Sequence, residues 1–292
     1  MKEFLNENTL YNTLAMYLAE GNSLLLVVEG PDDHLMLKEH CSSDLVLIAG
    51  IGGKGQVLRA AELCIKRDLR GVRFLVDRDY DDFTGLKRIN LNNVFMSEGH
   101  DCFIDVLTSD PALLNRVIDV ESSSARRRPG ITSALPNPSE IQAEAVALAS
   151  HLVAVRVMDA RRGLGLDFKK FSFGGLKVSE FDIKVIAEKV LVRSSYGGAD
   201  SVEIIDEVVR THLEMRELPH LPVGDHDLFS ALSRILKQFN VSVSSNALHR
   251  GVILAVSCSA LKGTIWFKQI QEWCARNDRV GFTCVSSTAF AA

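Results

Sequence analysis

The sequence has few cysteines, and they lack the spacings that cysteine chemistry usually needs. The 292 residues include six cysteines, with no Cys-x-x-Cys pair and no zinc-type spacing to histidine. Most lie beside apolar residues, so we expect buried thiols in a reduced, cytoplasmic protein without redox or zinc chemistry. The six are Cys41, Cys64, Cys102, Cys258, Cys274 and Cys284.

Long apolar runs and a strong net charge are also missing. No run approaches the roughly 18 residues of a membrane span, and the first seven residues lack the apolar core of a signal peptide, so we expect no membrane association. The net charge is −4 and 47% of the residues are hydrophobic, as in an ordinary globular protein. This length suits about two domains. The net charge does not favour a nucleic-acid binder, but an acidic metal site can hide a local basic surface in that sum.

The sequence does contain three short apolar runs, which alternate with segments of helical length. They cover residues 24–28, 45–48 and 72–76, and a fourth strand is expected at 93–96. Short buried strands that alternate with helices predict an α/β fold, with a mainly parallel sheet covered by helices on both faces. In such sheets the reactive groups gather at the carboxyl ends of the strands.

Acidic side chains follow two of these runs directly. Glu29 follows the first run, with Asp33 four residues later, and Asp77 and Asp79 follow the third. Several carboxylates at one sheet edge repel one another unless a cation neutralises them, and hard oxygen ligands suit Mg²⁺ or Mn²⁺. The Asp77-x-Asp79 spacing places both acids on the same side of an extended chain. The alternative is that these acids cap helices and fill turns, as Asp32 and Asp33 would at a helix start.

These acids belong to a motif that resembles a known domain. The run Val28-Glu29-Gly30-Pro31-Asp32-Asp33, followed by Leu75-Val76-Asp77-Arg78-Asp79, resembles the TOPRIM domain of topoisomerases, primases and OLD-type nucleases. The resemblance implies that Glu29, Asp77 and Asp79 are catalytic and that they hold Mg²⁺ together with Asp33. An acid on the helix after the fourth strand can complete such a site, which points to Asp105, although relatives often have the longer Glu there. Asp101 is expected to be the N-cap of that helix.

A glycine-rich turn lies between the second strand and its helix. Gly52-Gly53-Lys54-Gly55 is too short for a Walker A loop, so we expect no ATP site. Similar turns recur in OLD-type TOPRIM domains, which implies that the glycines bring the backbone close to the site and that Lys54 meets a phosphate. A glycine turn with a solvated lysine is an equally good interpretation.

The chain changes character after residue 110, which predicts three parts. Residues 1–110 form the TOPRIM-like catalytic domain, 111–250 a mostly helical domain, and 251–292 a C-terminal segment that packs on the core. Residues 121–139 are rich in Ser, Arg and Pro and predict a connector. Its Arg126, Arg127 and Arg128, with Arg161 and Arg162, are the candidates for nucleic-acid phosphate contacts, and solvated charge is the alternative. Helices are expected at 139–158, capped by Ser139, and at 179–193, 200–215 and 225–239, while 252–256 suits strand or helix.

The chemistry that these patterns leave open is that of a nuclease. No Ser/His/Asp or Cys/His ordering suggests a nucleophilic hydrolase, and neither a strand-passage tyrosine module nor a primase zinc domain is recognisable. The closest resemblance is to single-chain TOPRIM proteins that act with an ABC-type ATPase in phage defence. It implies a toxic effector, active as a homodimer in the cytoplasm, that cleaves RNA such as tRNA, or DNA. The alternative is a catalytically silent TOPRIM-fold docking subunit of an ATPase complex.

Overall fold

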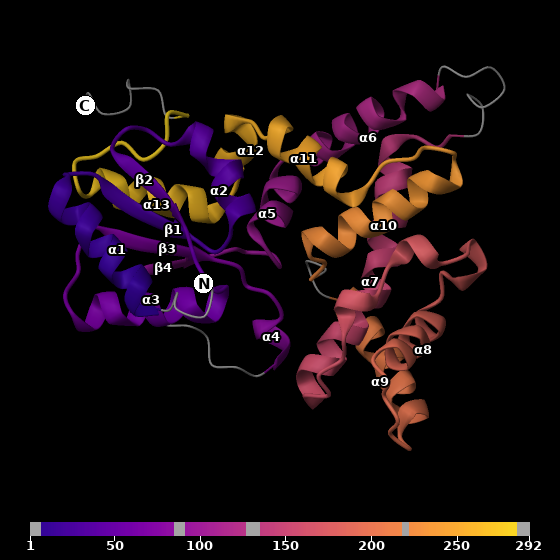
Figure 1. Ribbon diagram of the computed structural model, residues 1–292. Coiled ribbons are helices and arrows are strands. Elements are labelled where there is room, and N and C mark those ends of the chain that lie inside the picture. The colour runs from indigo at the N-terminus through magenta and orange to yellow at the C-terminus, as the bar shows by residue number, and fades with distance from the viewer. Residues whose placement is uncertain (1–6, 85–90, 127–134, 218–221, 285–292) are drawn as a thin grey trace. The chain divides into compact units, whose positions relative to one another are not determined.

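The computed structural model describes residues 7–84, 91–126, 135–217 and 222–284 (Figure 1). The fold is α/β, as predicted. The helices and strands follow in the order α1 Glu7–Glu20, β1 Leu24–Val28, α2 Pro31–Leu37, η2 Lys38–His40, β2 Leu45–Ala49, α3 Lys54–Lys66, β3 Val72–Val76, α4 Asp81–Thr84, β4 Val94–Met96, α5 Cys102–Ser109, α6 Pro111–Arg126, α7 Pro138–Arg162, η3 Phe168–Lys170, η4 Phe173–Gly175, η5 Val178–Glu180, α8 Ile183–Arg193, α9 Ser201–Arg216, α10 Asp225–Gln238, α11 Ser245–Ala255, α12 Cys258–Gly263 and α13 Ile265–Ala275.

The chain divides into two compact units. Unit 1 contains Met1–Arg78, Ile89–Asp110 and Val256–Ala292, and unit 2 contains Asp79–Arg88 and Pro111–Ala255. The domain boundaries predicted from sequence lie after residues 110 and 250. In the structure, the corresponding divisions between the units lie after residues 110 and 255. The short segment 79–88 groups with the helical unit 2, whereas the sequence assigned it to the catalytic domain.

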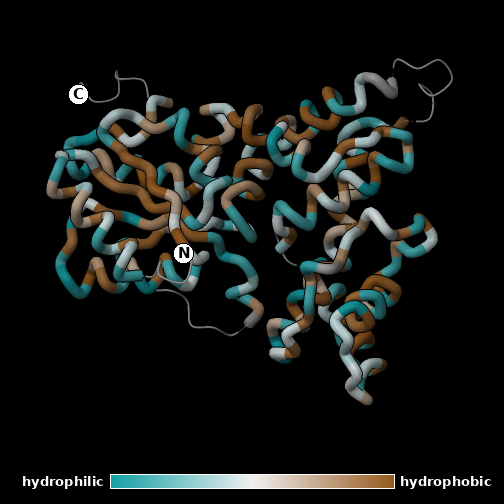
Figure 2. Tube along the Cα trace, viewed as in Figure 1, coloured by the Kyte–Doolittle hydropathy of each residue, from teal (hydrophilic) through white to brown (hydrophobic). Residues whose placement is uncertain are grey.

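The sheet of unit 1 has four parallel strands in the order β2-β1-β3-β4. Apart from Arg73, the two central strands consist of Val, Leu and Phe, and every residue of β1 is buried. Such runs form strands because branched and aromatic side chains pack well on a pleated surface that is covered on both sides. Figure 2 shows these strands as hydrophobic segments inside unit 1. Because all four strands are parallel, their carboxyl ends meet at one edge.

Alternate strand residues face two different layers of helices. Leu25, Val27, Phe74 and Val76 belong to the core cluster that also contains buried side chains of α1 and α3. On the opposite face, the Trp273 ring of α13 lies near two side chains of the sheet: the Phe95 ring, at 6.4 Å between centroids, and the Arg73 guanidinium, at 5.4 Å. The period of two along each strand therefore divides the core into two layers.

Helix α7 forms the core of unit 2. Asn137 caps it by accepting from the Glu140 amide at 2.9 Å, and the Glu140 side chain accepts from the Asn137 amide, so the expected Ser139 cap is wrong. The left-handed Gly163 ends the helix. Its length and composition would also suit a membrane span, but 61% of the apolar window is buried inside the structure, as in an ordinary core helix.

Two other sequence interpretations are corrected by the structure. Residues 121–126 continue helix α6, so the predicted connector begins later than expected, and most of the rest of it lies outside the described residues. The segment 252–256, left open as strand or helix, is helical through Ala255, as the end of α11. Val252 is buried on the same helical face as Leu248, whereas Leu254 is exposed.

The expectation that most cysteines are buried thiols in a reduced protein fails for two of them. Cys258 and Cys284 form a disulfide within unit 1, with Cα atoms 5.3 Å apart. The sequence does not indicate this pairing, because the two cysteines are 26 positions apart and no short spacing marks them. The other four, Cys41, Cys64, Cys102 and Cys274, are free.

Candidate metal centre

Glu29 stands at the junction of three chain segments at the carboxyl edge of the sheet. It follows β1 directly, and its Oε1 accepts from the Lys54 amide at 3.1 Å, at the start of α3. Its Oε2 accepts from the Asp77 amide at 3.3 Å, just after β3. Two backbone donors therefore fix this half-buried carboxylate, which was predicted from sequence to lie at this edge.

Asp77 is half-buried and lies among the other acids of this edge. Burial raises its pKa well above the usual value, and the carboxylates of Asp33, Asp101 and Glu29 raise it further. One hydrogen bond works in the opposite direction, because the Cys102 amide donates to Asp77 Oδ1 at 3.0 Å. The pKa of Asp77 is thus raised first by burial and then by the neighbouring carboxylates.

Asp33 comes from the first turn of α2 and is buried. Its Oδ2 accepts from the Gly30 amide at 3.0 Å, which fixes the turn between β1 and the helix. Ligand atoms of Asp33, Asp77 and Cys102 all lie within 4.8 Å of one another. The predicted role of Asp33 as a helix-start residue and its place in the acidic cluster are thus both observed.

Cys102 was not predicted from sequence to belong to this site, and Asp101 was expected only as a helix cap. Asp101 is indeed the N-cap of α5, because its Oδ1 accepts from the Ile104 amide at 2.8 Å, and its Oδ2 lies 3.1 Å from His100 Nδ1. Burial and the surrounding carboxylates raise the pKa of the Cys102 thiol well above its usual value. The position of both residues in the loop and helix start after the short strand β4 is the signal that could have placed them at this edge.

The glycine turn before α3 approaches Glu29. Gly52 and Gly53 both have left-handed φ values, 81° and 73°, which residues other than glycine rarely adopt. This geometry presents the Lys54 amide to Glu29, as the TOPRIM resemblance implied for the backbone. The Lys54 ammonium donates to the carbonyl of Arg78 at 3.0 Å. Lys54 therefore lies beside the chain after β3, and its contact with a phosphate stays a prediction.

Asp79 does not follow the extended arrangement expected from its spacing to Asp77. Its φ is 52°, in the left-handed region, so the chain has turned by this residue. Arg78 fixes the approach to this turn, because its amide donates to Ser97 Oγ at 2.9 Å and its Nε to the Ser97 carbonyl at 3.1 Å. Asp79 is also the first residue of unit 2. Its role as a metal ligand stays a prediction.

Asp105 is turned toward a loop of the backbone. Its Oδ1 accepts from the Gly99 amide at 2.6 Å and its Oδ2 from the Glu98 amide at 2.8 Å. Burial raises its pKa to about 6 despite these two hydrogen bonds. Asp105 is also not among the groups that raise the pKa of Asp77. In this structure it stabilises the loop that follows β4, and its role as a metal ligand stays a prediction.

The donor set of this edge fits a hard divalent cation. Carboxylate oxygens of Asp33 and Asp77 converge beside Glu29, and these are the ligands that Mg²⁺ and Mn²⁺ prefer. The carboxylates of Asp33, Asp101 and Glu29 lie close enough to Asp77 to raise its pKa. The Cys102 sulfur is a soft atom and, with its raised pKa, a neutral thiol, so it packs against the acids without suiting Mg²⁺.

The arginines expected to contact nucleic acid differ in their surroundings. Arg161 pairs with Glu214 at 3.1 Å, and Arg162 pairs with Glu203 at 3.0 Å, with Asp200 at 3.4 Å and with Glu207. These two are therefore engaged in ion pairs of unit 2. Arg126 ends α6, and its side chain, like the whole of Arg127 and Arg128, lies outside the described residues.

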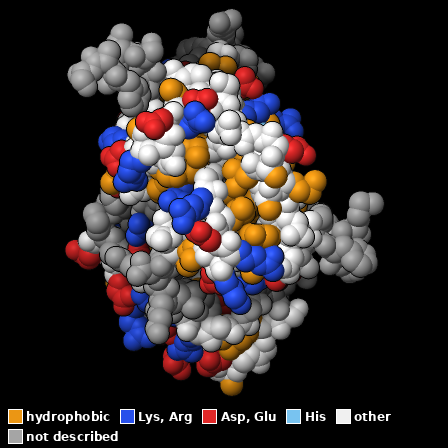
Figure 3. Space-filling model, turned by 90° about the vertical axis from the view of Figure 1, so that its left-hand side faces the viewer, with side chains coloured by type: hydrophobic (Ala, Val, Ile, Leu, Met, Phe, Trp, Pro, Cys, Tyr) orange, Lys and Arg blue, Asp and Glu red, His pale blue; other side chains and the backbone are white. Residues whose placement is uncertain are grey.

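The surface drawn in Figure 3 carries basic and acidic side chains that are mixed, with hydrophobic patches between them. Among the described side chains on this face, charge of one sign does not form a continuous tract. The face thus does not by itself indicate a path for a long polyanion.

No model of a known protein family matches the chain, and no curated protein is significantly similar to it.

Proposed function

We propose that this protein is a Mg²⁺-dependent nuclease of the TOPRIM type that hydrolyses phosphodiester bonds. The observation that carries the proposal is the convergence of Asp33 and Asp77 beside Glu29 at the carboxyl edge of a parallel sheet. When bound there, Mg²⁺ would activate water and stabilise the negative charge that develops on the phosphoryl group.

Each acid has a distinct part in this proposal. Asp33 and Asp77 hold the metal, since the first is buried, the second is half-buried, and their ligand atoms lie within one 4.8 Å cluster. Glu29 is a further ligand or the general base that takes a proton from the attacking water. Two backbone amides hold its carboxylate in place before any substrate arrives, which lowers the cost of ordering it. The TOPRIM resemblance adds Asp79 as a ligand, which requires its turn to bring the side chain to the same cation.

The biological setting follows from the same resemblance. It supports a cytoplasmic, toxic effector of phage defence, active as a homodimer, that an ABC-type ATPase partner holds inactive until infection. RNA such as tRNA is the preferred target and DNA the second. The helical unit 2 would bind the nucleic acid, dock the ATPase, or do both.

Incubation of the purified chain with nucleic acids tests this function. Total tRNA, ribosomal RNA and plasmid DNA are each incubated with the protein in Mg²⁺ and in excess chelator. Asp77→Asn should abolish Mg²⁺-dependent cleavage while the fold, followed by circular dichroism, persists. Asp278→Asn is the matched control in unit 1, because Asp278 is exposed and its left-handed φ of 56° suits Asn. This control should cut like the parent.

The docking subunit is the outcome that would replace the nuclease. In that case the parent and Asp77→Asn proteins would be equally inactive on every nucleic acid, and expression of the parent chain would not harm its host. Cleavage by the parent that Asp77→Asn leaves unchanged would instead place the active site elsewhere.

A further inference from the structure

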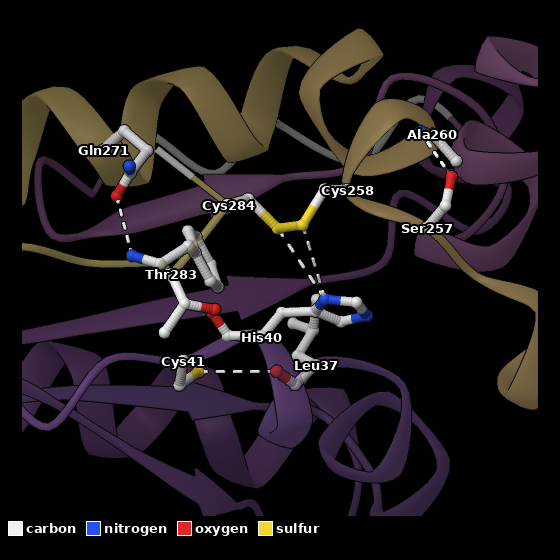
Figure 4. Close-up of a disulfide and its surroundings, with 10 residues drawn as sticks. Leu37, His40, Cys41, Ser257, Cys258, Ala260, Gln271, Thr283 and Cys284 are labelled. Carbon is white, nitrogen blue, oxygen red and sulfur yellow. Dashed lines mark hydrogen bonds between the residues drawn. A yellow bond between two sulfur atoms is a disulfide. The ribbon is translucent and has the colours of Figure 1, made fainter. Parts of the chain in front are cut away.

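The C-terminal strap, defined here as Val280–Cys284, lies against residues 40–42 (Figure 4). These residues belong to the end of the connection between β1 and β2 in unit 1. The Thr283 amide donates to the His40 carbonyl at 2.8 Å, and the Ser42 amide donates to the Gly281 carbonyl at 3.0 Å. Cys41 and Phe282 form an antiparallel bridge. The strap therefore pairs with residues 40–42 through backbone hydrogen bonds that do not involve a sulfur atom.

An aromatic anchor holds the same strap in the core. Phe282 is fully buried, and its ring stacks on Phe267 of α13 with centroids 4.5 Å apart. Its amide donates to Gln271 Oε1 at 3.0 Å. Cys284, two residues later, is thus held near His40 by packing and hydrogen bonds as well as by its disulfide. The arrangement does not need the sulfur–sulfur bond for its position.

His40 presents its ring to both sulfurs of the disulfide. Its Nδ1 lies 3.9 Å from Cys258 Sγ and 3.7 Å from Cys284 Sγ (Figure 4). Ligand atoms of His40, Cys258 and Cys284 lie within 4.8 Å of one another. Three separate parts of the chain supply them: η2, the start of α12 and the strap.

These distances match those of a tetrahedral zinc site. Zn–S bonds of about 2.3 Å and Zn–N bonds of about 2.0 Å place a ligating nitrogen about 3.6 Å from each ligating sulfur. The observed 3.7 and 3.9 Å are already close to this value. Once the disulfide is reduced, only the two sulfurs need to separate, to about 3.8 Å.

We propose that His40, Cys258 and Cys284 form a zinc site when the disulfide is reduced, so that the strap is held by either a disulfide or a metal ion. In the first form the two sulfurs bind each other, and in the second both bind Zn²⁺ as thiolates beside the His40 imidazole. Three protein ligands leave a fourth position for water. The site is separate from the acidic edge and does not rest on the proposed nuclease function.

The conversion of the disulfide into the zinc site needs a reductant, and a dithiol can serve. The dithiol gives two electrons and two protons, becomes a disulfide itself, and leaves Cys258 and Cys284 as thiols. Zn²⁺ then binds both sulfurs and His40 Nδ1, and two protons leave to solvent. In a reducing compartment, where disulfides rarely persist, the metal would thus replace the covalent link.

The neighbouring Cys41 provides an internal control, although it follows His40 directly in the chain. Its sulfur donates to the Leu37 carbonyl at 3.5 Å and lies on a different side of the imidazole from the disulfide (Figure 4). Cys41 is also absent from the three-residue cluster. A cysteine adjacent in sequence is therefore expected not to bind the metal.

The experiment uses the whole chain in its oxidised and dithiol-reduced forms, with the reductant removed under inert gas. Co²⁺ serves as a probe, because tetrahedral Co²⁺–thiolate sites absorb in the visible and near ultraviolet, and excess Mg²⁺ saturates the acidic edge. The reduced parent should develop this spectrum with one Co²⁺ per chain, and Zn²⁺ should abolish it. The oxidised parent should not. Zn²⁺ should also raise the melting temperature of the reduced form only.

Variants then assign the ligands. His40→Ala and Cys284→Ser should each weaken or remove the thiolate spectrum, whereas Cys41→Ser should retain it. If a variant does not fold, the comparison of reduced and oxidised parent protein still decides, since it needs no substitution. A reduced parent without a Co²⁺–thiolate spectrum would overturn the proposal, and so would a spectrum that Cys41→Ser removes and His40→Ala leaves intact.

Discussion

The Asp77 amide donates to Oε2 of Glu29 at 3.3 Å, although 48 positions separate the two residues in the sequence. The other oxygen of the same carboxylate accepts from the Lys54 amide. One side chain thus joins the ends of β1 and β3 to the turn after β2. An acid that the TOPRIM resemblance marks as catalytic is therefore also a structural link between three segments of the sheet edge.

Glu29→Ala should abolish cleavage and also lower stability. Its removal takes the acceptor from two backbone amides, each of which costs about 1 kcal/mol or more when it is not replaced. Water can reach this half-buried position, so we expect a total loss of about 1–2 kcal/mol in the free energy of unfolding, measured with urea.

Glu62→Ala is the control for this prediction, because Glu62 is an exposed residue of α3 in the same unit. It should change stability by less than about 0.5 kcal/mol and leave activity intact. A Glu29→Ala protein that cleaves at the parent rate would remove Glu29 from the active site, whatever its stability.

The Asp105 carboxyl should make stability fall as the pH rises from about 4 to 6. Its pKa is raised from 3.8 to about 6 in the folded protein, mainly by burial. Between these values the folded state binds more protons than the unfolded state, so its stability is highest at low pH and is lost as the pH passes the folded pKa. The loss should be on the order of 2 kcal/mol.

Asp105→Asn isolates this effect, because Asn does not titrate. The difference in unfolding free energy between the parent and the variant should shrink as the pH rises through this window. The variant should be less stable than the parent at pH 4, since its NH₂ group faces the Glu98 or Gly99 amide in place of an acceptor. Parallel pH profiles for the two proteins would show that the pKa of Asp105 is not raised.

Much of the sheet edge could be predicted from sequence, because the signals there are local. Each strand is a short and mostly apolar run. Glu29 and Asp77 follow the ends of such runs directly, and the glycine turn follows the end of β2 within three residues. The parallel order then brings these ends together without further information. The TOPRIM resemblance rests on the same local signals.

The remaining features depend on distant or three-dimensional contacts. Cys258 and Cys284 lie more than 200 residues from His40 along the chain, so no spacing rule joins them. Asp105 lies on the expected helix, but the direction of its side chain toward the Gly99 amide depends on the loop after β4. The turn at Asp79 is a backbone conformation that its spacing to Asp77 did not reveal.

Asp227→Ala should strongly destabilise unit 2. Asp227 is buried and binds the Arg156 guanidinium through two hydrogen bonds of 2.7 and 2.9 Å. Its removal leaves a mostly buried cation without its main partner, which costs about 3–5 kcal/mol. The exposed pair of Lys184 and Asp206, 3.8 Å apart, is the control, and Asp206→Ala should cost less than about 1 kcal/mol. Equal losses in the two variants would contradict this ranking.

If unit 2 binds the nucleic acid, the arginine run at 126–128 should account for part of the affinity. Replacement of Arg126, Arg127 and Arg128 by Ala should then weaken binding, and each lost phosphate contact should lower the log–log salt slope by about one. If the run instead docks the ATPase, the same variant should cut normally and lose that association. The control is the triple variant Arg250→Ala, Lys262→Ala and Lys268→Ala. It also removes three positive charges, from exposed positions. A triple arginine variant that binds, cuts and docks like the parent would leave the run as solvated charge.

Direct titration of Mn²⁺ is the sharpest test of the metal centre. The parent should bind Mn²⁺, and Asp77→Asn and Asp33→Asn should each weaken the affinity more than about tenfold. Asp32→Asn, at the exposed neighbour of Asp33 in the same helical turn, should bind like the parent. Asp79→Asn shows whether the turned residue shares the cation. Equal Mn²⁺ affinity in the parent, Asp33→Asn and Asp77→Asn proteins would contradict a metal centre at this edge, and with it the proposed nuclease mechanism.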